Sequence, residues 1–146
     1  MDLTGDYEYF CNYDDINRNY TNDTIVDNLF NFISARIEAR IVAPATDTYK
    51  FSLVHEDGVN LTIDGDPVIY NWVIGGHTTN GTKSLTQNVA YDLILEWFEY
   101  NEIAHLKFYW EYGGNSLQIV PLEANWKNYE HSINRSPITV TVLSPI

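Results

Sequence analysis

The sequence predicts an all-β domain, a mostly antiparallel β-sandwich with some barrel character. Apolar residues recur at every second position over many short segments, and Gly, Asn, Asp and Pro separate these segments at regular spacing. No segment has the apolar periodicity of an amphipathic helix of normal length, and only residues 25–33 could form a helical turn or two. This punctuation of short strands points to a sandwich or barrel.

The first strands can be placed in order along the chain. Residues 35–41 alternate Ala and Ile with charged residues, which predicts a half-buried strand whose outer charges offset one another. Residues 49–53 and 59–63 form the next two inward rows. The Asp64-Gly65 pair after them predicts a tight turn, because this dipeptide tolerates positive φ.

Two later segments continue the same pattern. Residues 91–97 and 104–110 alternate apolar and polar positions, and their inward rows place Trp97 and Trp110 in the core. The link at residues 100–102 is short enough for a hairpin between these two strands.

The chain is expected to contain one domain and its exit. Residues 138–142 alternate once more, beyond the polar segment 131–136. We expect a sandwich domain over residues 1–130, and a linker or strand over residues 131–146 that leads toward a following domain. Residues 1–5 have no basic or apolar signal sequence, so we expect the chain to be a piece of a longer protein.

The composition limits the partners of the chain. Asp and Glu number 20 against 8 Lys and Arg, which gives a formal net charge of −12. Such a surface repels phosphate backbones, so nucleic acid is not an expected partner. The single cysteine, Cys11, allows no disulfide within the chain, and no window approaches the roughly 18 apolar residues of a membrane span.

Asn-x-Ser/Thr sequons occur five times, at Asn19, Asn22, Asn60, Asn80 and Asn134. They are candidate acceptors of N-linked glycans if a eukaryotic cell secretes the protein. In a bacterial protein they would carry no such meaning.

The acidic turn Glu56-Asp57-Gly58 has two interpretations. Calcium takes about 6–8 oxygen ligands, typically carboxylates supplemented by carbonyls and water, and a loop can direct two carboxylates at one point. Glu56 and Asp57 are therefore candidate calcium ligands. The alternative is a hairpin turn without a metal, in which Asp57-Gly58 favours left-handed backbone and Glu56 is solvated.

Other residues could complete a sugar-binding site beside that turn. Trp72 and Tyr112 border expected loops, where their rings could stack on the C–H faces of sugars. His55 directly precedes the acidic turn and is a further candidate contact. Asn115, in a polar loop after two glycines, could add an amide oxygen to the metal site.

Catalytic residues do not stand out. The sequence has no Gly-x-Ser-x-Gly nucleophile turn, and its four histidines lack zinc-ligand spacing. No pair of carboxylates is singled out for glycoside hydrolysis. We therefore expect no enzymatic activity.

An ordered set of motifs resembles the PA14 domain family over roughly residues 3–126. The motifs share the order and spacing of the family's strands and turns, from Gly-x-x-x-Tyr-Phe at the start to a closing apolar-Pro pair. They lie at residues 5–10, 41–44, 48–53, 56–65, 68–72, 91–100, 104–110 and 120–121.

The resemblance implies a β-sandwich and, in lectin-like members, calcium-dependent sugar binding. In those members two adjacent aspartates joined by a cis peptide bond hold calcium, an asparagine and carbonyls of a later loop complete the site, and the metal binds sugar hydroxyls. Asp57 matches the second aspartate, whereas Glu56 departs from the first by one methylene group. Asn115 is the candidate for the later asparagine.

We therefore expect a non-enzymatic binding module of a larger extracellular or cell-surface protein, which recognises glycans or cell-surface glycoproteins through calcium. The alternative is a structural or assembly module of a glycosylated filament, adhesin stalk or toxin that binds no sugar. A third interpretation is an accessory insert of a glycoside hydrolase. In each case neighbouring domains of the parent chain are expected partners.

Overall fold

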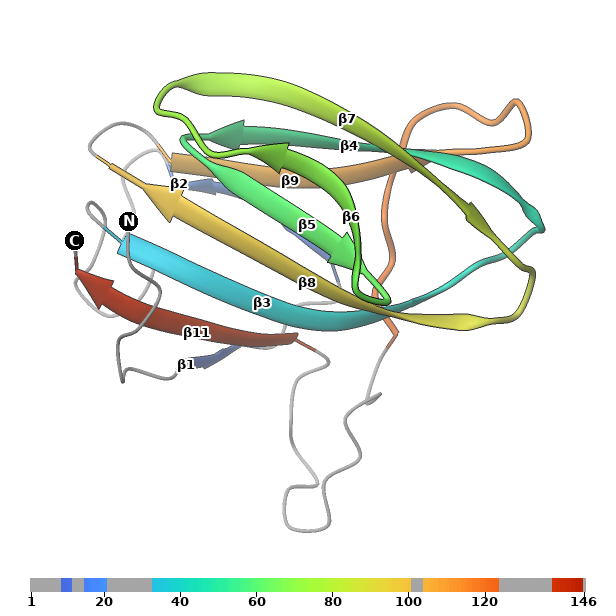
Figure 1. Cartoon of the computed structure of the whole chain (residues 1–146), viewed down its shortest axis with the longest axis horizontal. Coiled ribbons are helices and arrows are strands. Elements are labelled where there is room, and N and C mark those ends of the chain that lie inside the picture. Colours follow the sequence, from blue (N-terminus) through green and yellow to red (C-terminus); the bar gives the residue numbers. More distant parts are fainter. Residues whose placement is uncertain (1–8, 12–14, 21–32, 101–103, 124–137, 146) are drawn as a thin grey trace, which may run out of the picture.

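A computed structural model describes residues 9–11, 15–20, 33–100, 104–123 and 138–145, and these residues form β-strands joined by turns (Figure 1). The strands are β1 (Tyr9–Cys11), β2 (Asn17–Tyr20), β3 (Ile33–Val42), β4 (Asp47–Glu56), β5 (Val59–Ile63), β6 (Asp66–Asn71), β7 (Gly76–Leu85), β8 (Ala90–Glu99), β9 (Ala104–Glu111), β10 (Gln118–Ile119) and β11 (Ile138–Pro145).

Two antiparallel sheets stack as a sandwich. The first has the strand order β1-β11-β3-β8-β5-β6, and the second has the order β10-β9-β4-β7 with β2 also paired to β9. Figure 1 shows β3, β8 and β11 in one layer and β4, β7 and β9 in the other. The predicted all-β sandwich is thereby confirmed.

The predicted inward rows form the core. Ile41, Leu61 and Leu95 of the first sheet face Phe51 and Phe108 of the second, and all are fully buried. Fully burying one such side chain stabilises the fold by about 1.5–3 kcal/mol. The predicted burial of both inward tryptophans is also confirmed.

The β5–β6 turn is the hairpin predicted from its sequence. Asp64 and Gly65 have φ values of 50° and 78°, and Ile63 lies opposite Asp66. Positive φ at both central residues matches the right-handed twist of the strands.

The predicted hairpin between residues 91–97 and 104–110 is wrong. β8 pairs with β3 and β5 in the first sheet, whereas β9 pairs with β4, β2 and β10 in the second. The chain therefore changes sheets between these strands, and each strand turns its apolar row toward the other sheet. A short link permits this crossing as readily as a hairpin.

The edge strands β6 and β7 close one side of the sandwich. A Cβ atom built on Gly81 of β7 would lie 1.9 Å from the carbonyl oxygen of Val68 in β6, so the two backbones touch where a larger residue cannot fit. This contact gives the sandwich its barrel character.

The C-terminal strand lies within the sandwich, because β11 pairs with β3 on one side and β1 on the other. The proposed exit toward another domain remains a prediction. Residues 25–32, where a helical turn was expected, lie outside the described residues.

Candidate functional site at the acidic turn

The acidic turn joins the two sheets rather than two strands of one sheet. β4, which ends at Glu56, pairs with β7 and β9, and β5 after Gly58 pairs with β6 and β8. Asp57 between them has a φ of 57°. The hairpin interpretation of this turn is therefore wrong, although its left-handed backbone is as predicted.

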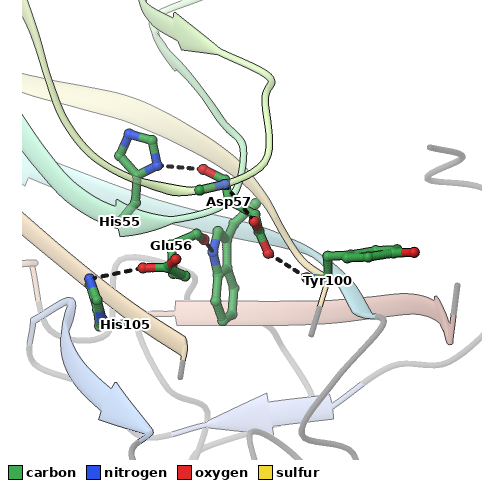
Figure 2. Close-up of polar contacts among 7 residues, drawn as sticks. His55, Glu56, Asp57, Tyr100 and His105 are labelled. Atoms are coloured by element: carbon green, nitrogen blue, oxygen red, sulfur yellow. Dashed lines mark hydrogen bonds and ion pairs between the residues drawn. The ribbon is translucent and has the colours of Figure 1, made fainter. Parts of the chain in front are cut away.

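Asp57 holds two loops together (Figure 2). One carboxylate oxygen accepts a hydrogen bond from the Gly75 amide at 2.9 Å, and the other accepts one from the Tyr100 amide at 2.5 Å. The Asp57 amide in turn donates to the Gly75 carbonyl at 3.2 Å. Asp57 is only 2% exposed, so these amides replace water as the partners of its charge.

Glu56 faces the outer side of the second sheet. Its carboxylate lies 3.4 Å from the Nε2 atom of His105 on β9 (Figure 2). Its backbone carbonyl accepts a hydrogen bond from the Trp97 indole at 2.7 Å. The carbonyl thus ties the turn to β8 in the other sheet.

His55 is fully buried, so the contact with a sugar that was expected of it cannot form. Its Nδ1 atom lies 2.6 Å from the Asp57 carbonyl, which can only accept, so the neutral ring carries its proton there. Nε2 then accepts from the Thr79 hydroxyl at 2.9 Å, and Thr79 accepts from the Asn71 amide at 3.0 Å. This chain links β4, β7 and β6.

Acidification should destabilise the domain through His55. Burial, followed by the nearby His77 and His105, lowers the pKa of His55, although the Asp57 carbonyl and carboxylate oppose that shift. His55 therefore binds a proton more readily in the unfolded chain than in the folded one. Its contribution to the stability of the fold is fully present above the unfolded pKa of about 6.5, and it is lost as the pH falls toward the lowered pKa of the folded state.

We expect the melting temperature of the wild type to fall by a few degrees between about pH 7.5 and pH 5.5. His55→Asn, whose amide can still donate to the Asp57 carbonyl, should flatten this dependence in a thermal melt. His105→Gln should retain it, and an identical slope in all three proteins would contradict the assignment.

Asn115 and Tyr112 lie at the opposite end of β4. Lys50 pairs with Glu111, and the Gly113 amide donates to Asp47 at 2.6 Å, so this loop borders the first residue of β4. Nine residues of strand, roughly 30 Å, separate it from the turn. The Tyr112 ring stacks on the Tyr49 ring with centroids 4.5 Å apart, and it is partly buried against the hydrophobic core. The grouping of Asn115 with the acidic turn is therefore wrong.

The residues expected to bind calcium are not brought together in the described part of the chain, and a role for calcium remains a prediction. Both Asp57 oxygens already accept backbone amides, and Asn115 is remote. The described residues contain no group of three or more His, Cys, Asp or Glu suited to a metal ion.

Aromatic and aliphatic side chains lie beside the turn. Trp72, between β6 and β7, packs edge-on against Phe98 with ring centroids 4.8 Å apart. Val73 and Ile74 are 50% and 61% exposed, and Tyr100 is also exposed, with its ring directed away from the turn (Figure 2). We call Trp72, Val73, Ile74 and Tyr100 the aromatic edge. Of these four residues, only Trp72 was predicted to contact a sugar. The apolar Val73-Ile74 pair, in a segment otherwise typical of a loop, could also have indicated a binding surface.

The sequons differ in their surroundings. Asn60 is partly buried and donates to Glu96 at 3.1 Å, whereas Asn80 is exposed and accepts from Ser52 at 2.6 Å. Asn19 is exposed on β2. Asn22 and Asn134 lie outside the described residues.

Fold and site together define the class: a two-sheet antiparallel sandwich whose sheets are joined at a buried aspartate. The family model for the PA14 domain matches residues 2–124, and the chain belongs to this family. PA14 domains are usually non-catalytic binding modules, some of which bind sugars, and they typically occur in secreted or surface proteins. In the described part of the chain, no helix is long and apolar enough to cross a membrane.

Solved structures share the fold. An anti-sigma factor domain-containing protein from Clostridium clariflavum is 24% identical with a TM-score of 0.71, and the match covers 83% of this chain and 43% of that one. The PA14 sugar-binding domain from an RTX adhesin is 19% identical with a TM-score of 0.53, over 64% of this chain and 55% of that one.

The PA14 domain of the MpAFP antifreeze protein is 16% identical with a TM-score of 0.55, over 84% of this chain and 59% of that one. The chain thus spans less than two thirds of each of these structures. A search of curated protein sequences finds no match. At these identities the likeness concerns the fold alone.

Proposed function

We propose that the domain is a non-enzymatic carbohydrate-binding module of a larger surface or secreted protein, and that it binds sugar at the aromatic edge. The observation that carries this proposal is the exposure of Val73, Ile74 and Tyr100 beside Trp72, on two loops that one buried carboxylate fixes. Exposed apolar patches on a single domain mark binding sites, and a rigid aromatic surface costs little entropy when it binds.

The chemistry of this edge suits a sugar ring. Tyr100 and Trp72 offer apolar ring surface for C–H groups, and a phenol hydroxyl or indole N–H for sugar hydroxyls. The net charge of −12 disfavours sulfated or phosphorylated ligands. Calcium is left out of the proposal, because Asp57 is engaged by backbone amides.

A glycan array probed with the intact chain, followed by calorimetry, tests the proposal. We expect binding to neutral glycans that is the same in millimolar calcium and in chelator. Tyr100→Ala should weaken it by about fivefold, since an aromatic contact contributes about 1 kcal/mol. Its backbone amide still reaches Asp57, so folding is preserved. Tyr109→Ala, on the outer face of the other sheet, is the matched control. A blank array at millimolar glycan would refute the proposal.

The second candidate is an assembly module, which the exposed aliphatic pair Val73 and Ile74 favours. Such a pair suits a protein partner better than a sugar. In that case the array stays blank, and sedimentation detects self-association that Ile74→Asp abolishes.

A further inference from the structure

A hollow lined mainly by residues with polar or charged groups lies on the outer face of the first sheet, away from the core. It has a volume of about 260 Å³, and three adjacent strands line it with Arg36, Glu38, Asn60, Thr62, Ile94 and Glu96. The strand register explains this grouping, because residues paired directly across neighbouring strands share one face. Arg36, Glu96, Asn60 and the β6 residue Tyr70 form one row, and Glu38, Ile94 and Thr62 form the next.

Hydrogen bonds fix the first row. Nε and Nη2 of Arg36 donate to one oxygen of Glu96 at 3.2 and 2.9 Å, and the Asn60 amide donates to its other oxygen at 3.1 Å. Within the described residues, the Nη1 group of Arg36, the amide oxygen of Asn60 and the Thr62 hydroxyl make no hydrogen bond. The hollow therefore presents donors and acceptors that are held in place and unused.

Apolar surface adjoins these polar groups. Ile94 in the hollow is 40% exposed, and Tyr70, beside Asn60 on the edge strand, is 70% exposed. Trp72 follows Tyr70 by two residues, one position past the end of β6, so both residues lie at the same border of the sheet. Tyr70 thus lies next to the lining residue Asn60, between the hollow and the aromatic edge.

The charges restrict the ligand. One guanidinium faces two carboxylates in the hollow, and the chain as a whole is strongly acidic, so an anion would be repelled. A neutral saccharide fits, because its hydroxyl groups both donate and accept while its C–H faces pack on Tyr70 and Ile94.

We propose that this hollow is a second carbohydrate subsite, which binds one residue of a neutral, linear oligosaccharide whose neighbouring residues pass over Tyr70 to Trp72. This inference rests on the proposed function and adds a second subsite, a linear ligand and the path of that ligand. It requires no cation.

Calorimetry with a length series of the neutral glycan selected on the array tests this path. The wild type should bind more tightly as residues are added, until both subsites are filled. Thr62→Val and Tyr70→Ala should each weaken binding of the long ligand by about fivefold and remove the gain with length, because each deletes about 1 kcal/mol of contact. Because Asn60 lies in a sequon, the protein is made in a host that adds no N-glycans.

Thr78→Val, the same chemical change on an exposed position of the other sheet, is the control and should bind like the wild type. Both threonine variants should melt within about 1–2 °C of the wild type, as surface substitutions do. If the wild type binds glycans but Thr62→Val and Tyr70→Ala bind them equally well at every length, the second subsite is refuted and the proposed function stands. If the wild type binds no glycan, both fall, and a preference for sulfated glycans refutes the ligand class.

Discussion

Replacing Asp57 by glycine should lower the free energy of unfolding by about 3 kcal/mol, because two backbone amides lose the buried carboxylate that accepts their hydrogen bonds. These are the amides of Gly75 and Tyr100, which belong to different loops. Glycine isolates this loss, since it adopts the positive φ of Asp57 without strain. For a domain of this length, the melting temperature should fall by roughly 10 °C.

Urea denaturation and thermal melting, each with calcium and with chelator, measure the effect and separate the two roles of the turn. If Asp57 is a structural anchor, Asp57→Gly is destabilised equally in both media. If it is a calcium ligand, the wild type is more stable in calcium, and the variant differs from it only there. That second outcome would restore the calcium hypothesis.

Asp66→Ala provides the control. Asp66 is an exposed carboxylate whose ion pair with Lys83 lies at the surface, and it should contribute less than about 1 kcal/mol. Asp57→Asn should fall between Asp57→Gly and the wild type, because its amide retains one accepting oxygen.

The sequence predicts the core but not the partners of its turns. The alternating rows around Phe51, Leu61, Leu95 and Phe108 identify inward faces, because burial imposes a period of two on any strand of a sandwich. A turn sequence such as Asp57-Gly58 specifies positive φ. It does not specify whether the next strand pairs with the preceding one or crosses to the other sheet, so both expected hairpins outside β5–β6 were wrong.

Strand β7 escaped prediction for a different reason. Its inward positions hold His77, Thr79, Gly81 and Lys83 instead of large apolar residues, although they alternate in burial with exposed neighbours. This strand faces β6 at close range rather than the centre of the core, so small and polar side chains are required there. Hydrophobic periodicity cannot detect such a strand.

The prediction of the candidate site was limited because its parts are far apart in the sequence. The partners of the Asp57 carboxylate lie 18 and 43 residues away and are backbone amides, which carry no side-chain signature. Asn115 was misplaced because the pairing of β4 with β9 was not foreseen. Antiparallel pairing puts the loop after β9 beside the start of β4, at the far end from the acidic turn.

Replacing Gly81 by alanine should cost about 3 kcal/mol, at the upper end of the usual cost of overpacking. The new Cβ would lie 1.9 Å from the Val68 carbonyl oxygen and 2.8 Å from its carbon, and a backbone group cannot rotate away as a side chain can. Gly76→Ala in the same strand is the control, because its Cβ would meet the end of the Glu56 side chain, nearest at Oε2 at 2.8 Å, and a side chain can move aside. Urea denaturation of the two variants gives the comparison.

The added methyl group of Gly81→Ala should push β6 away from β7, and this displacement should also alter the proposed binding surface. Tyr70 lies on β6, and the hydrogen bond from Asn71 to Thr79 joins that strand to β7 next to Trp72. A variant that remains folded should therefore bind the neutral glycan more weakly than Gly76→Ala does, although neither substitution touches the ligand. Equal stability of the two variants would show that β6 can move away from β7 at little cost in free energy. The contact between these two strands would then not be what positions Tyr70 and Trp72.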